Sequence, residues 1–447
     1  MRKFGISILC AAVAVIAVLF SYFMMRNTNG DGTLSAETVY NLAKESGYEG
    51  TFEEFIDEFR GASGKDGVGI ASAKVNSKGR LIITYTDGQT VDAGAVNVGS
   101  QTVSNEISGL ALNYALTSSV SIHAKLAENQ YSSGGGVIYK LNKTAGDAYI
   151  ITNHHVLYNK TEGQRVADAD ISVYLYGMEY PEYAIPVQYV GGSSTYDIAV
   201  LKISGSEVLK NSSALAARQG NSELIALLDT VVAIGNPAGS GISATRGSVS
   251  IESENRYVNI TASGGSVFMR IIRFDAAVNK GNSGGGLYNA DGELIGIVTA
   301  KDTSDGSEGM AYAIPVNVVA SVADNILHYC AGQENEHGKV LKMGLGLGVK
   351  SVNVIYDEIR ECTVKYETVL INSVEAGSYA ESLGLAVGDV LKSVSVDGAA
   401  REITGVYQAP EMMLFAREGS TIVYTVIRGT ETLSFTLTVP SNLTQIK

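Results

Sequence analysis

Tryptophan, cysteine and basic residues are scarce in this sequence. Its 447 residues include no tryptophan, three cysteines, and 33 lysines and arginines against 46 aspartates and glutamates, for a formal net charge of −13. This excess of negative charge argues against nucleic acid or an anionic lipid surface as the main partner. Three cysteines are too few for a disulfide scaffold, although a single Cys330–Cys362 bridge stays open. No cluster of cysteine or histidine has the spacing of metal ligands, so we expect neither a metal nor another cofactor.

Charge is missing altogether from one long run at the N-terminus. Arg2 and Lys3 precede this run, which extends from Phe4 to Met25. As a helix it is long enough to span a bilayer, and its positive start favours the cytoplasmic side. We therefore expect a signal anchor over residues 1–25 that crosses the cell membrane once, through residues 4–25, and leaves the rest of the chain extracytoplasmic. A cleaved signal peptide is the alternative.

Length and residue pattern divide the remainder into three parts. Residues 26–100 contain two short helical patterns and then an alternation around two turns, which predicts a small β-meander. Residues 104–330 contain many short strand patterns separated by glycine turns, typical of an all-β barrel or sandwich. Residues 338–440 combine further strands with two helical segments, near Tyr379–Leu383 and Pro410–Arg417.

One serine, Ser283, stands among glycines in the stretch "GNSGGG". Taken alone, such a stretch is more often a flexible loop than an active site. A nucleophilic serine needs a base, and the base needs an acid that orients it. For a nucleophile at this position, the backbone N–H groups around Gly281, Asn282 and Ser283 are candidates for an oxyanion hole.

A candidate base and a candidate acid precede this serine. The pair His154–His155 ends the apolar stretch "AYIITNHHVL", and strand alternation leaves open which histidine faces a site. Asp197 begins the apolar stretch "YDIAVLKI", where an unpaired carboxylate would be costly, with a simple turn cap as the alternative. The order histidine, aspartate, serine is that of the chymotrypsin-type double barrel and predicts nucleophilic hydrolysis.

Several longer stretches resemble the HtrA family of serine proteases. They are "YIITNHHVL", "VVAIGNPAGSGISATRGSVS", "FDAAVNKGNSGGGLYNADGELIGIVTAK" and "MAYAIPV". The resemblance implies a catalytic triad of His155, Asp197 and Ser283, and so selects His155 over His154. It also implies homotrimers that act on unfolded protein or peptide substrates.

The same resemblance implies a mainly β architecture. Its parts are an N-terminal transmembrane helix (1–25), a chymotrypsin-like double β-barrel protease domain (104–330) and a C-terminal PDZ domain (338–440). Between the first two, the residue pattern predicts a small α+β stalk module (26–100). The stalk resembles a module of exported proteins of Gram-positive bacteria and of phage fibres, and we assign it no chemistry.

A loop that binds peptide C-termini is implied by the stretch "GLGLGV". In a PDZ domain, backbone N–H groups of such a loop receive the terminal carboxylate of a peptide that adds a strand. Two registers fit, Gly344–Leu347 and Gly346–Val349. The first register places the loop at Gly344, Leu345, Gly346 and Leu347.

Substrate preference follows from the position six residues before the nucleophile. In this fold that residue lies at the base of the pocket for the side chain preceding the cut, and here it is Ala277. The predicted pocket residues are Ala277, Val298, Thr299 and Ala300. Because none is a carboxylate, we expect cleavage after small or medium aliphatic residues rather than after arginine or lysine.

Lys280 and Gly286 depart from the family pattern, which usually has proline at both positions. Proline would stiffen the nucleophile turn, so we expect a looser oxyanion loop and a substrate-activated resting state. The sequence predicts a membrane-anchored serine endopeptidase that degrades misfolded or damaged proteins under stress. The alternatives are a catalytically inert surface adaptor that binds peptides through its PDZ domain, and a serine esterase on the same fold.

Overall fold

The computed structural model describes residues 70–75, 80–85, 90–95, 107–128, 130–159, 163–260, 265–301, 309–330, 340–352, 355–357, 362–364 and 367–446. The chain divides into two compact units, residues 1–100 and 101–447. In the first unit, β1 (Ile70–Val75), β2 (Arg80–Tyr85) and β3 (Thr90–Ala95) form an antiparallel meander, as the sequence pattern predicts. The two helices predicted before it, and the run at residues 4–25, lie outside the described residues. None of the helices in the described part of the chain is long and apolar enough to cross a membrane.

The second unit opens with helix α4 (Gly109–Thr117), whose first turn is capped by Ser108. The hydroxyl of Ser108 accepts a hydrogen bond from the N–H of Ala111 at 3.1 Å, which satisfies one donor of the helix start. A seven-stranded antiparallel sheet follows, in the order β10-β9-β4-β5-β6-β12-β11. Its strands are β4 (Ser119–Ala127), β5 (Gln130–Asn142), β6 (Asp147–Thr152), β9 (Ile171–Leu175), β10 (Ile185–Pro186), β11 (Gln188–Ser193) and β12 (Ile198–Ile203).

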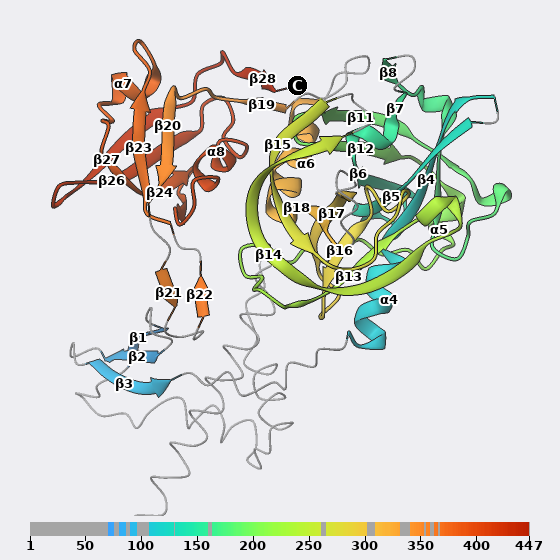
Figure 1. Ribbon diagram of the computed structural model, residues 1–447, viewed down its shortest axis with the longest axis horizontal. Coiled ribbons are helices and arrows are strands. Elements are labelled where there is room, and N and C mark those ends of the chain that lie inside the picture. Colours follow the sequence, from blue (N-terminus) through green and yellow to red (C-terminus); the bar gives the residue numbers. More distant parts are fainter. Residues whose placement is uncertain are drawn as a thin grey trace, which may run out of the picture. The chain divides into compact units, whose positions relative to one another are not determined.

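A second set of strands closes into a barrel in the order β13-β14-β15-β18-β17-β16. Figure 1 shows β14 and β15 as a long curved pair on this barrel. The strands are β13 (Thr230–Gly235), β14 (Ser243–Ile260), β15 (Gly265–Phe274), β16 (Gly286–Asn289), β17 (Leu294–Lys301) and β18 (Ala311–Pro315). Short elements lie in the connections: η1 (His154–Leu157), β7 (Tyr158–Asn159), β8 (Gln164–Arg165), η2 (Asp168–Asp170), η3 (Pro181–Tyr183), α5 (Glu207–Lys210) and η4 (Pro237–Gly239).

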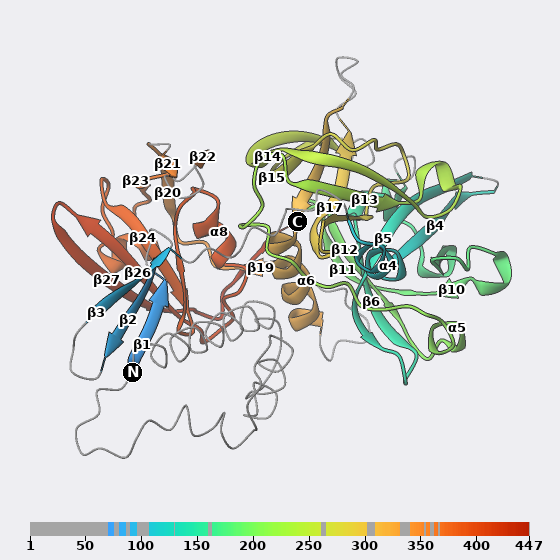
Figure 2. The same cartoon turned by 90° about the horizontal axis from the view of Figure 1, so that it is seen from below.

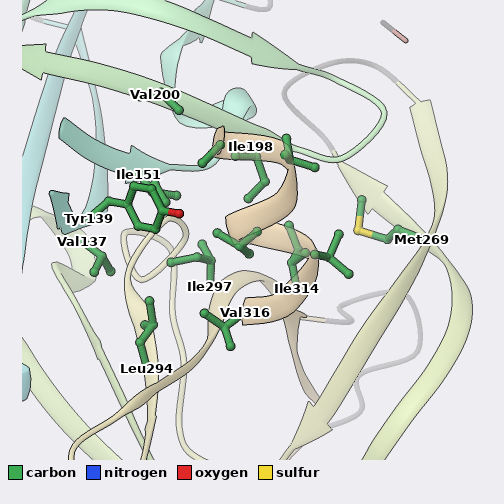
Figure 3. Close-up of a cluster of buried hydrophobic side chains, with 14 of the residues drawn as sticks. Val137, Tyr139, Ile151, Ile198, Val200, Met269, Leu294, Ile297, Ile314 and Val316 are labelled. Atoms are coloured by element: carbon green, nitrogen blue, oxygen red, sulfur yellow. The ribbon is translucent and has the colours of Figure 1, made fainter. Parts of the chain in front are cut away.

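One hydrophobic core joins the seven-stranded sheet to the closed barrel. Ile151 and Ile198 come from the sheet, Ile297 comes from the barrel, and all three are fully buried. Figure 3 shows such side chains gathered around helix α6 (Val316–Cys330). Because successive strand residues point to opposite faces, Ile150 packs instead into the separate interior of the first sheet. Each fully buried aliphatic side chain contributes roughly 1.5–3 kcal/mol, so this core fixes the two strand systems against each other.

A smaller sheet domain occupies residues 340–446. Its strands follow the order β20-β23-β24-β26-β27, with β25 paired to β24, and Figure 2 shows helix α8 beside this sheet. The elements are β19 (Val340–Lys342), β20 (Leu347–Ser351), β21 (Ile355–Asp357), β22 (Cys362–Val364), β23 (Val369–Val374), α7 (Tyr379–Leu383), β24 (Val390–Val396), β25 (Ala399–Glu402), α8 (Gln408–Met412), β26 (Thr421–Arg428), β27 (Glu431–Thr438) and β28 (Thr444–Ile446).

The second helix of this domain differs from its predicted bounds. The sequence predicts a helical segment at Pro410–Arg417, whereas the helix in the structure, α8, runs from Gln408 to Met412. Pro410 falls in the first turn, where a missing N–H leaves no helical hydrogen bond unmade. Beyond the helix, the guanidinium of Arg417 donates to the carbonyls of Leu414 and Ala416 at 2.6 and 3.1 Å. The side chain of Arg417 thus donates hydrogen bonds to main-chain carbonyls that follow the end of α8.

Cys330, the last residue of α6, is not part of a disulfide. Its sulfur donates a hydrogen bond to the carbonyl of Val190 in β11 at 3.4 Å. The Cys330–Cys362 bridge that the sequence left open is therefore not formed.

A buried ion cluster connects α8 with β15. The guanidinium of Arg270 donates to Glu411 at 3.0 Å and to Glu223 at 2.7 Å, and its carbon lies 3.7 Å from the ring centre of Tyr407. Burial raises the pKa of Glu411 to about 7. At neutral pH this carboxyl is therefore poised between its neutral and charged forms.

We expect the stability of this chain to fall as pH rises toward neutrality, in part because of Glu411. A carboxyl whose folded-state pKa is raised binds its proton more tightly in the folded chain, so its stabilising effect is complete at acid pH and is lost as pH rises through about 7. Glu411→Gln abolishes the titration while keeping a similar shape. Thermal unfolding at about pH 5 and about pH 8 should show a larger loss in the wild type than in this variant. Equal losses would contradict the assignment.

Candidate active site

His155 and Asp197 form a direct pair. Nδ1 of His155 lies 2.8 Å from Oδ2 and 3.0 Å from Oδ1 of Asp197, and the backbone N–H of His155 donates to Oδ1 at 3.0 Å. The backbone N–H of the neighbouring residue, His154, donates to the main-chain carbonyl of Asp197 at 3.2 Å. Of the two adjacent histidines, the structure thus brings the ring of His155 to the carboxylate.

Asp197 is held from several sides and is 1% exposed. The hydroxyl of Thr299 donates to its Oδ2 at 2.6 Å, and Nδ2 of Asn153 donates to its carbonyl at 2.8 Å. Its φ of 51° lies in the left-handed region, which aspartate enters more readily than most residues. A buried carboxylate is costly unless donors surround it, and here His155 and Thr299 both donate to it. The sequence predicts a pocket position for Thr299, whereas in the structure its hydroxyl contacts the carboxylate of Asp197.

Ser283 lies beside the same threonine. Its hydroxyl donates to the carbonyl of Thr299 at 3.0 Å, and its own carbonyl accepts from the N–H of Gly135 at 2.8 Å. Thr299 therefore contacts both the carboxylate of Asp197 and the hydroxyl of Ser283, which brings the predicted acid and nucleophile to one place. Among the hydrogen bonds of the described residues, none joins Ser283 to His155. Attack would therefore require the Ser283 hydroxyl to rotate from Thr299 toward the imidazole.

The loop before Ser283 offers two unused donors. The N–H of Asn282 donates to the carbonyl of Asn279 at 3.0 Å, whereas no hydrogen bond within the described residues engages the N–H of Gly281 or of Ser283. Of the three residues predicted for the oxyanion hole, Asn282 thus contributes no free N–H, because the turn consumes it. Gly281 has a φ of 102°, and a Cβ there would clash with the carbonyl of Asn236. Only glycine fits this position.

The ring of Tyr288 leaves no room for a side chain at Gly286. A Cβ on this residue would lie 2.6 Å from Cζ and 2.7 Å from Oη of Tyr288. Tyr288 is fully buried, and its hydroxyl lies 3.1 Å from the hydroxyls of both Ser118 and Ser119. The tyrosine ring thus fills the space above Gly286 and is itself held in place. Whether the loop is looser than in relatives with proline stays a prediction.

Gly286→Ala should destabilise the fold by about 1–3 kcal/mol, because the added methyl group displaces the ring of Tyr288. The same substitution in a Tyr288→Leu background should cost less, since the clash is removed. Guanidinium unfolding of the wild type, both single variants and the double variant measures this coupling. Additive effects would show that the ring does not restrict Gly286.

The predicted pocket residues lie in different environments. Ala277 is exposed, and its carbonyl accepts from the hydroxyl of Thr245 at 2.7 Å. Val298 is 2% exposed and packs in the core of the closed barrel, so its side chain belongs mainly to that core. Its backbone pairs with the nucleophile loop, through Gly284 N–H to Val298 O at 2.8 Å. The side chain of Ala300 lies outside the described residues.

The predicted carboxylate loop lies just before β20. Gly346 has a φ of 72°, and its carbonyl accepts from the N–H of Glu375 at 2.9 Å. The carbonyl of Leu345 accepts from Ala380 at 3.0 Å, and the strand begins at Leu347. This loop-to-strand transition falls within the register Gly344–Leu347.

Known proteins resemble this chain over the residues just described. The trypsin-like peptidase domain family matches residues 134–297. The chain is 34% identical over 271 residues to Serine protease Do-like HtrA of Bacillus subtilis, which covers 59% of this chain and 54% of that protein. A solved structure, HtrA-type protease AlgW with tripeptide, shares 28% identity with a TM-score of 0.48, over 76% of this chain and 96% of that one.

A second curated relative matches over a longer stretch. Serine protease Do-like HtrA of Lactobacillus helveticus is 30% identical over 377 residues, which are 81% of this chain and 83% of that protein. Against the Bacillus subtilis protein, by contrast, the aligned part spans about half of the relative's length. Because the longer alignment runs through most of both proteins, the chain belongs to the HtrA family of serine proteases.

Proposed function

We propose that this chain is a serine endopeptidase that hydrolyses peptide bonds of unfolded or damaged proteins. One observation carries the proposal: Thr299 contacts both Asp197 and Ser283, while Asp197 holds the ring of His155 at 2.8 Å. The contacts from Ser283 to Thr299, from Thr299 to Asp197 and from Asp197 to His155 support a joint role of the three groups that serine hydrolysis needs. Within the described residues, the backbone N–H groups of Gly281 and Ser283 beside them make no hydrogen bond. Family membership supports the same reading.

Each group has a defined task in this mechanism. The Ser283 hydroxyl attacks the peptide carbonyl carbon, and His155 accepts its proton through Nε2 and then passes it to the leaving amine. Asp197 accepts the bond from Nδ1–H, which fixes the tautomer and stabilises the imidazolium. The N–H groups of Gly281 and Ser283 donate to the oxyanion as negative charge develops on it. A water molecule then attacks the acyl carbon while His155 accepts its proton. The acyl group leaves as a carboxylic acid, and His155 returns the proton to the Ser283 oxygen.

Cleavage after small or medium aliphatic residues is the specificity that we propose. Ala277 at the pocket base provides no carboxylate that could pair with arginine or lysine. Digestion of an unfolded protein, with the fragments sequenced, should show valine, alanine or leucine before most cuts. Cleavage chiefly after arginine would contradict the pocket assignment.

A panel of matched peptide and ester substrates separates an endopeptidase from an esterase, and an inert adaptor would hydrolyse neither.

The C-terminal domain would bind the C-termini of substrate peptides as a PDZ domain. The positive φ of Gly346 and the strand start at Leu347 support the loop Gly344–Leu347 as the carboxylate site. Backbone N–H groups in such a loop can receive a carboxylate while the peptide pairs with the adjoining strand. We further propose anchoring in the cell membrane through residues 4–25, with the catalytic part extracytoplasmic, and assembly as a homotrimer.

A further inference from the structure

We propose that Asn236 is a positioning residue for the oxyanion hole. This inference rests on the proposed hydrolase function and assigns a task to a residue outside the triad. Asn236 directly follows β13 and has no exposed surface. It links β4 of the first sheet, the turn at η4 and the loop before Ser283 through hydrogen bonds.

The orientation of one peptide group is the first step of the argument. The carbonyl of Lys280 accepts from the N–H of Ala238 at 2.8 Å. This carbonyl and the N–H of Gly281 belong to the same planar trans peptide, so they point in opposite directions. Holding the carbonyl on Ala238 therefore directs the Gly281 N–H away from the η4 turn. If this peptide turned over, a carbonyl would replace the donor that the oxyanion requires.

A second bond fixes the next peptide group of the loop. The N–H of Asn236 donates to the carbonyl of Gly281 at 3.1 Å. The absence of a side chain at Gly281 permits this approach, because a Cβ there would meet the carbonyl oxygen of Asn236. The oxyanion loop thus rests on Asn236 and Ala238, and its shape depends on where these two residues lie.

The side chain of Asn236 fixes that turn to the first sheet. Its Nδ2 donates to the hydroxyl of Ser121 at 2.6 Å and lies 3.3 Å from Nε2 of His123, while its Oδ1 accepts from the N–H of Gly241 at 2.9 Å. Burial lowers the pKa of His123, which favours the neutral ring whose Nε2 can accept. All polar atoms of the amide are thereby engaged. A buried amide with these partners allows little freedom of position.

The turn itself holds a backbone conformation that needs such support. Ala238 has a φ of 56°, which is unusual for a residue with a side chain. Residues held in sparsely populated regions persist when their surroundings determine them, and they gather at functional sites. The Ala238 N–H that this conformation presents is the one that holds the Lys280 carbonyl.

The test compares Asn236→Ala with a matched control, Asn325→Ala, in the full-length chain. Asn325 is also fully buried, and its amide bonds the main chain of Leu341 at 2.8 and 2.9 Å and of Leu414 at 3.0 Å, in the region of α6 and β19. Both variants should lower the melting temperature. Only Asn236→Ala should lower kcat for a short peptide, by about 10²-fold or more, with KM nearly unchanged. Ser121→Ala should lower kcat in the same direction by a smaller factor.

Affinity for a peptide boronate provides a second measurement. Its tetrahedral adduct with Ser283 places an oxygen in the oxyanion hole, so Asn236→Ala should weaken binding by a factor similar to the loss in kcat. A product peptide, which carries no such oxygen at a tetrahedral centre, should bind both proteins alike. An equal kcat for Asn236→Ala and Asn325→Ala, or a loss confined to KM, would overturn the proposal.

Crystal structures of the wild type and of Asn236→Ala separate this inference from the proposed function. The variant should release the Lys280 carbonyl from Ala238 and reorient the Gly281 N–H. An unchanged peptide orientation would overturn the positioning role even if the wild type is active. A wild type that hydrolyses no peptide substrate would instead overturn the proposed function. The orientation of the main-chain peptide group between Lys280 and Gly281 would still show whether Asn236 positions this loop.

Discussion

Replacing Ser283 by alanine should lower kcat for peptide hydrolysis by about 10⁶-fold. The variant lacks the only group that the mechanism uses to attack the carbonyl carbon, and His155 then has no proton to accept. Stability should change little, since within the described residues the Ser283 hydroxyl makes a single hydrogen bond, to the carbonyl of Thr299. Casein degradation and short-peptide kinetics measure the first effect, and thermal unfolding measures the second.

The control for this prediction is Ser434→Ala, at an exposed position of β27. It should leave kcat unchanged. If the Ser283 variant kept degrading casein at a rate comparable with the control, the hydrolysis would not depend on this hydroxyl. The triad mechanism would then be wrong, whatever the family of the chain.

Asp197→Asn should lower kcat by about 10⁴-fold. The carboxylate accepts from the hydroxyl of Thr299 and from both the ring and the backbone N–H of His155. An amide offers one oxygen in place of two, and its NH₂ group would lie opposite a hydrogen-bond donor of His155 or Thr299. The imidazole would lose its fixed tautomer and the charge that stabilises its protonated form. Steady-state kinetics at saturating peptide measure the loss.

Asp389→Asn is the matched control, because Asp389 is also 1% exposed and hydrogen-bonded to a cation, Arg428 at 2.7 Å. Breaking this pair should lower the melting temperature and leave kcat for a short peptide unchanged. Similar losses of kcat in both variants would indicate that Asp197 acts only through stability. The comparison therefore separates the orientation of His155 from general support of the fold.

The local structure around the proposed triad residues differs from what the residue pattern predicts. Strand alternation does not describe His154 and His155, because both lie in η1, where a 3₁₀ turn rather than a strand orients them. The choice of His155 came from the family resemblance, and its contact with Asp197 agrees with it. The left-handed backbone of Asp197 could not be predicted, since it depends on partners that lie up to 102 residues away in the chain.

Contacts between distant segments account for what the sequence did not reveal. Thr299 was expected to line a pocket, but its hydroxyl reaches Asp197 and its carbonyl reaches Ser283. The motif "AIGNPAG" indicates the family, but its residues alone do not predict the bonds of Asn236 to β4 and to the loop before Ser283. Contact with Tyr288 likewise explains the glycine at position 286, because the tyrosine ring occupies the space that a side chain there would need.

Labelling with diisopropyl fluorophosphate tests the central claim most directly. The reagent phosphorylates a serine hydroxyl that a neighbouring base activates and an oxyanion hole assists. We expect one label per full-length chain, mapped to Ser283 by mass spectrometry, and no label after unfolding. Absence of labelling of the folded chain, or a label on a different serine, would contradict the assignment of Ser283, His155 and Asp197 as a working triad.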